Sequence, residues 1–331
     1  MPNKEKKKYL EEVQKKELPS LLGENILSFR PEIKKETPEK KKLPEIRLTS
    51  LDFDRDCQKW DNAWLLTADV KMLVLHESGA QQFYDEEKLV ESVHYFELLC
   101  RIYAEDVCVQ AKNYDKVREF WYMSALSELR AEQLYYEGEY PVKLSHIAYQ
   151  LENFQYDAVF GAMIRAYAVG EDWIWRKLFP IAERQYNKYV NKGGTYLKNH
   201  RTTFKDVRTL YNILNGEDSD LIRANITEWG KGEFSEGITA ILNKDIKELR
   251  KAVLKSVRHD RKMYELNRTM VDPHAYACLR LAHEHGLDIP PIKAVEVLES
   301  RLDFKPIDKD KCKIPFQDKI EAWLADNIKD F

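Results

Sequence analysis

The segment 237–289 restricts the fold of this chain most strongly. It contains three successive helix patterns with short joints, and Pro273 and Gly286 stand where a helix typically begins and ends. In the middle pattern, 245–264, apolar residues recur on one face while lysine and arginine recur on another. An apolar face of this kind packs against a core. The segment therefore predicts a packed helical unit.

The rest of the chain repeats this pattern. Between 86 and 112 one apolar stripe has 4-3-4-3-4 spacing and consists of Leu89, Val93, Phe96, Cys100, Tyr103 and Val107. Further helix patterns cover 114–136, 141–170, 171–191, 204–214, 221–229, 234–243, 272–286, 292–303 and 316–328. Pro180 predicts a kink or a restart within 171–191, because proline lacks the amide donor and crowds the preceding turn.

Composition supports helices throughout. Only 12 glycines and 12 prolines occur in 331 residues, and 44% of the residues are hydrophobic, which is enough for a large core. The distances between breakers are irregular, so a regular helical solenoid is not indicated. The sequence predicts an all-α fold, an irregular multi-helix bundle of paired antiparallel helices.

Domain organisation follows from the position of the prolines. Residues 1–50 carry five prolines, lysine runs and a surplus of about four positive charges, which predicts a charged, extended N-terminal arm. Residues 51–331 then form a single all-helical domain, with a possible internal boundary near 193–203, around Gly193-Gly194.

Net charge and cysteine content indicate which partners and which cellular compartment to expect. The net charge of −3 favours neither nucleic acid nor a membrane surface as a partner. No window approaches 18 consecutive apolar residues, and the N-terminus lacks the apolar region of a secretory signal. The five cysteines form no metal-binding pair or disulfide framework, which is typical of a reducing compartment. We therefore expect a cytoplasmic protein that binds no membrane and no nucleic acid.

The sequence contains no strong catalytic motif. Glycine-rich phosphate loops and a nucleophile elbow are absent. Glu91 and His94 have the E-x-x-H spacing of di-iron bundles, but no second such pair occurs, so an ordinary pair on a helix surface is the preferred interpretation. His274 and Cys278 could supply two metal ligands, and a buried core thiol is preferred there. We expect no enzyme activity, no metal and no cofactor.

Exposed charges and one tryptophan are the candidates for binding a partner. The basic stripe on 245–264 includes Lys251, Lys255, Arg258 and Lys262, which could meet an acidic partner or simply face solvent. Two acidic joints, Glu137 with Glu139 and Glu217 with Asp218 and Asp220, could face a basic partner or could be solvated or capping residues. Trp173 could anchor an interface or lie in the core.

The C-terminal pattern resembles the immunity protein 49 family of bacterial polymorphic-toxin systems. The resemblance lies in the joint 241–245, the helix start Asp272-Pro273 and the segment 281–287, which reads Leu-Ala-His-Glu-His-Gly-Leu. The small-residue segment 160–171, which ends in Gly170-Glu171, looks like an earlier helix of that family. The charged arm 1–50 and the tail from Asp303 depart from the family pattern.

The resemblance implies an antitoxin: a cytoplasmic protein that binds a cognate toxin domain and blocks its active site or substrate channel. Since the chain shows no export signal, the toxin is expected to act in the cytosol. Two alternatives remain open. One is a helical adaptor or regulator that uses the basic stripe, and the other is a helical enzyme with a dispersed site.

Overall fold

The computed structural model describes residues 88–102, 104, 114–142, 155–192, 208–229, 233–263, 273–287 and 306–328. No strand occurs in these ranges, and the helices pack in pairs, so the prediction of an all-α bundle is confirmed. The helices are α5 (Leu89–Ile102), α7 (Tyr114–Tyr136), α9 (Gln155–Val169), α10 (Asp172–Lys192), α12 (Ser219–Trp229), α13 (Glu233–Leu242), α14 (Ile246–Met263), α15 (Pro273–Glu284), the short 3-10 helix η4 (Lys309–Lys311) and α17 (Gln317–Asn327).

Several expectations lie outside the described residues. These are the N-terminal arm 1–50, the domain start at 51, the boundary near 193–203 and the helix 292–303. Within the described ranges, helices α7, α10, α12, α13, α14, α15 and α17 agree with their predicted bounds to within a few residues, whereas α9 begins at Gln155, well after the predicted start at 141. One local expectation needs correction: α10 continues past Pro180 instead of restarting there. Pro180 is exposed, so its ring lies on the solvent side of the helix rather than against the core.

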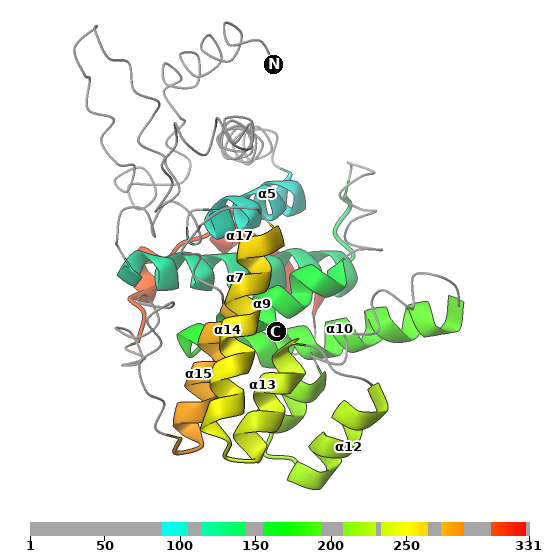
Figure 1. Cartoon of the computed structure of the whole chain (residues 1–331). Helices are drawn as coiled ribbons and strands as arrows, with labels where there is room; N and C mark the ends of the chain where they lie inside the picture. Colours follow the sequence, from blue (N-terminus) through cyan, green and yellow to red (C-terminus); the bar gives the residue numbers. More distant parts are fainter. Residues whose placement is uncertain are drawn as a thin grey trace, which may run out of the picture.

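Helix α7 lies at the centre of the larger group of helices. It packs against α5, α9, α10 and α17 (Figure 1). Most of its side chains from 117 to 134 are buried. The stripe on α5 faces this helix, with Leu89, Val93, Phe96 and Cys100 all buried as the spacing predicts. A helix buried on several faces is usually apolar all round. Helix α7 is not, since it also carries buried charged residues.

Helices α13, α14 and α15 form the second group, and they lie side by side in Figure 1. Asp245 begins α14, because its Oδ1 accepts hydrogen bonds of 3.0 Å from the backbone N–H groups of Lys247 and Glu248. This cap is the aspartate of the joint 241–245. Buried apolar residues from both groups of helices form one continuous core.

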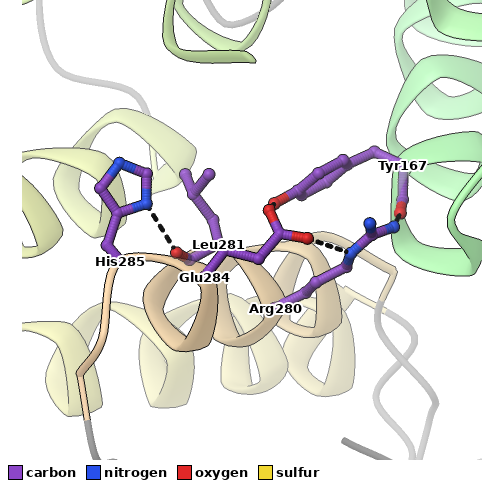
Figure 2. A network of polar contacts seen from close by, with 5 residues as sticks. All are labelled: Tyr167, Arg280, Leu281, Glu284 and His285. Carbon is purple, nitrogen blue, oxygen red and sulfur yellow. Dashed lines mark hydrogen bonds and ion pairs between the residues drawn. The ribbon is translucent and has the colours of Figure 1, made fainter. Parts of the chain in front are cut away.

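Helix α15 also joins the two groups by packing against α9. Arg280 donates from Nη1 to the backbone carbonyl of Tyr167 and from Nε to Glu284 Oε1 at 2.8 Å. The Tyr167 hydroxyl donates to Glu284 Oε2 at 2.7 Å (Figure 2). Gly170 and Gly286 end the two helices with φ of 88° and 70°, values that glycine adopts without strain. Two of the segments on which the family resemblance rests, 160–171 and 281–287, are therefore in direct contact.

Gly237 allows α13 and α15 to approach closely. A Cβ at this position would lie 2.8 Å from Sγ of Cys278. We expect Gly237→Ala to lower the free energy of unfolding by about 1 kcal/mol, because overpacking of about 1–3 kcal/mol exceeds the gain of roughly 1 kcal/mol in helix propensity. Urea denaturation measures this difference.

The control for Gly237→Ala is the same substitution in a Cys278→Ala background. There the sulfur is gone, so the added methyl group is expected to be neutral or stabilising. Equal effects of Gly237→Ala in both backgrounds would contradict the close contact between the two helices.

Candidate functional site

Charged side chains meet inside the group formed by α5, α7, α9 and α10. Each is at most 3% exposed, which is unusual because carboxylates and guanidinium groups are seldom fully buried without partners. We name this set the core carboxylate cluster, and it consists of Glu97, Glu128, Glu132, Arg165, Ser124 and Gln185.

Glu97 is the well-paired carboxylate of the cluster. Its Oε1 accepts hydrogen bonds from Arg165 Nη2 at 2.9 Å and from Ser124 Oγ at 2.8 Å. Burial alone would raise the pKa of Glu97, but the guanidinium groups of Arg101 and Arg165, followed by the Ser124 hydroxyl, lower it below its ordinary value. Glu97 is therefore ionised, and the Glu97–Arg165 ion pair links α5 to α9 through the core.

Glu128 and Glu132, the two carboxyl groups that α7 contributes to the cluster, lack such partners. Among the described residues, neither oxygen of Glu128 has a hydrogen-bond partner, and Glu132 accepts one bond, from Gln185 Nε2 at 3.1 Å. Burial raises the pKa of Glu128 to about 8, and the charge of Glu97 adds to the rise. Burial and then the charge of Glu128 raise the pKa of Glu132 well above its ordinary value. At neutral pH both groups therefore carry protons.

Of the two metal-type spacings in the sequence, one has different surroundings from those expected and the other agrees with its preferred interpretation. Glu91 and His94 are buried, at 0% and 7% exposure, so their interpretation as a helix-surface pair is wrong. The helix surface that carries them faces the core. Cys278 is buried, which confirms the core-thiol interpretation, and His274 lies against the ring of Phe160. Among the described residues, no group of three or more histidines, cysteines or acids could hold a metal ion.

One predicted acidic joint forms an exposed surface. Glu217, Asp218 and Asp220 are all exposed at the start of α12, where Asp218 Oδ1 accepts the backbone N–H of Asp220 at 2.7 Å. Leu221 follows with 47% exposure, and it is the one exposed large apolar side chain in the described part of the chain. We name these four residues the acidic corner. Capping fixes the backbone of the corner while its carboxylates face solvent.

The other acidic joint and Trp173 make contacts within the chain. Glu137 accepts a hydrogen bond of 2.9 Å from Arg184, whereas Glu139 is exposed and has a positive φ of 49°. Trp173 is half-buried, and its Nε1 donates to Glu171 Oε2 at 2.8 Å. The indole ring packs against the core, so this tryptophan is held by its own chain.

The basic stripe on α14 is partly neutralised by acids of the same chain. Lys255 Nζ lies 2.9 Å from Glu236 Oε1, and Lys251 pairs with Glu248. Arg258 and Lys262 also belong to α14, but their side chains lie outside the described residues. The described half of the stripe is therefore an exposed face of alternating charge.

Sequence reasoning missed the core carboxylate cluster. Two signals in the sequence could have indicated it. Arg165 is the one charged residue in a helix of small and apolar residues between 158 and 170. Glu128 and Glu132 are four positions apart on a helix that carries apolar residues on several faces. When a helix has no continuous polar face, a charged residue on it is expected to be buried and to interact with another polar side chain.

Membrane insertion and known relatives give no further guide to function. None of the described helices combines the length and the apolar character that crossing a membrane requires. No protein-family model, curated protein or solved structure matches the chain.

Proposed function

We propose that this chain is an immunity protein that binds a cognate bacterial toxin domain in the cytosol and blocks it. The observation that carries the proposal is the acidic corner, where three exposed carboxylates and an exposed leucine follow closely along the chain. An apolar centre with a charged rim is typical of a protein interface, and the negative charge favours a cationic partner. The resemblance to the immunity protein 49 family supports the same function.

Two further observations favour a binding role. The core carboxylate cluster is buried, so it does not favour a catalytic role in which a substrate must reach the acids. Lys251 and Lys255, which an adaptor would use to bind an acidic partner, already pair with Glu248 and Glu236. Competition from these internal partners weakens an interaction through the basic face. The acidic corner has no comparable basic partner among its described contacts.

The test is a co-expression rescue. The product of the adjacent gene is expressed in a bacterial host with and without this chain, and survival is scored together with a pull-down of the complex. Rescue with a stable complex supports immunity. A folded chain that neither rescues nor binds contradicts it and favours the adaptor alternative.

Variants then test the surface. We expect Asp220→Lys combined with Leu221→Asp to weaken binding by about tenfold or more, mainly through slower association at low salt. Asp326→Lys on α17 is the matched control, because it replaces an equally exposed aspartate on a different element. If both variants weaken the complex equally, the acidic corner is not the interface.

A further inference from the structure

The core carboxylate cluster contains more acid than base. Glu97 is matched by Arg165, which leaves Glu128 and Glu132 without a cation of their own. Three elements pack against these two groups. Helix α5 contributes Glu97 and Arg101, α9 contributes Arg165, and α10 contributes Arg184 and the neutral Gln185. These positive charges act on Glu128 and Glu132 from a distance, since the described contacts include no ion pair with either carboxyl group.

An ionised carboxylate in such a position is costly. Removing an unpaired charge from water costs many kcal/mol, so a buried carboxyl group keeps its proton instead. A protonated carboxyl group also removes repulsion between the two acids, which lie one turn apart on α7, and Glu97 opposite. The packing of α7 therefore depends on protons that no surface carboxylate would hold at the same pH.

We propose that Glu128 and Glu132 form a proton-dependent lock in the core: the packing of α5, α7, α9 and α10 is intact while both carboxyl groups are protonated and loosens as Glu128 ionises in mildly alkaline solution. The lock lies in the scaffold and acts whether or not a partner is bound. It makes stability, and with it any binding surface the scaffold carries, sensitive to pH.

The pKa values give the direction in which stability changes with pH and the pH range over which it changes. Burial raises the pKa of Glu128 to about 8, above its ordinary value of 4.5. The folded chain thus holds a proton that the unfolded chain has released, and the stabilisation is complete below the ordinary pKa and is lost as pH rises through about 8. The contribution of Glu97 to stability has the opposite pH dependence. Its pKa is lowered in the folded chain, so its stabilising contribution is lost as the pH falls into the acid range.

The experiment is urea denaturation of the full chain at a series of pH values from 5.5 to 9. In the window between about pH 5 and 8, the unfolding equilibrium constant is expected to rise about tenfold per pH unit for each retained proton. Glu128→Gln copies the protonated carboxyl group. The rise of its unfolding equilibrium constant with pH is therefore expected to be smaller than that of the wild type by a factor of about ten per pH unit. Glu217→Gln, at an exposed acid, is the control and is expected to keep the wild-type slope.

Two outcomes overturn the lock. One is a wild-type unfolding constant that stays level from pH 5.5 to 8, and the other is a Glu128→Gln variant with the wild-type slope. His94, whose charge acts on Glu97, is present in all variants, so any contribution it makes cancels in the comparison. If Glu128→Gln does not fold, ¹³C NMR of labelled glutamate in the wild-type chain decides. A carboxyl resonance titrating near pH 8 supports the lock, and titration of all glutamates below pH 6 contradicts it.

Discussion

Replacing Arg165 with methionine is expected to lower the free energy of unfolding by about 3–5 kcal/mol. The guanidinium of Arg165 is the direct partner of Glu97 in a core where both side chains are at most 4% exposed. Methionine fills similar space but leaves the Glu97 carboxylate buried without its counter-charge. The penalty of an uncompensated buried charge exceeds the worth of the pair itself. Chemical denaturation at neutral pH measures the loss.

The matched control is Arg184→Met. Arg184 forms an ion pair of the same length, 2.9 Å, with Glu137, but its side chain is 52% exposed. Solvent screening limits such a pair to about 0–1 kcal/mol. A double variant, Glu97→Leu with Arg165→Met, is expected to recover most of the stability, because no buried charge is left unpaired. Similar losses for Arg165→Met and Arg184→Met would contradict the core ion pair.

Trp121→Ala is expected to destabilise the chain by a comparable amount, about 3–5 kcal/mol. Trp121 is 1% exposed at the centre of α7, and its ring packs edge-on against Tyr276 of α15 with centroids 5.7 Å apart. Truncation removes a large buried area and leaves a cavity between the two groups of helices. The loss is measured by urea denaturation.

Trp323→Ala provides the comparison for Trp121→Ala. Trp323 lies on α17, where it is half-buried, packs against Tyr140 and donates from Nε1 to the carbonyl of Gly138 at 3.2 Å. Since less area is lost and solvent can fill the space, the loss is expected to be clearly smaller. A Trp121→Ala variant that unfolds no more easily than Trp323→Ala would show that α7 and α15 do not depend on this contact.

The helices could be predicted from the sequence because their signals are local. The stripe from Leu89 to Cys100 fixes the buried face of α5, and Gly286 and Asp218 mark where helices end and begin. These features depend on spacing, backbone conformation and capping within a few residues.

The core carboxylate cluster could not be predicted in the same way. Periodicity assigns charged residues to the solvent side, and that rule fails for α7 because other helices cover several of its faces. Whether Glu128 is exposed depends on where α5 and α9 dock, and the pairing of Glu97 with Arg165 joins positions 68 apart. Glu91 and His94 were assigned to the surface for the same reason. The acidic corner was more accessible to prediction, since its carboxylates lie in a joint between helices.

The contact between α9 and α15 has a consequence for synthesis on the ribosome. Arg280 follows Tyr167, whose carbonyl it contacts, by 113 positions. At a translation rate of about 5–20 residues per second, α9 is synthesised roughly 6–23 s before the helix that covers it. During that interval its side facing α15 is available to other chains and to chaperones. This face of the growing chain is thus open to aggregation between the synthesis of α9 and that of α15, and slower translation of this stretch lengthens the exposure.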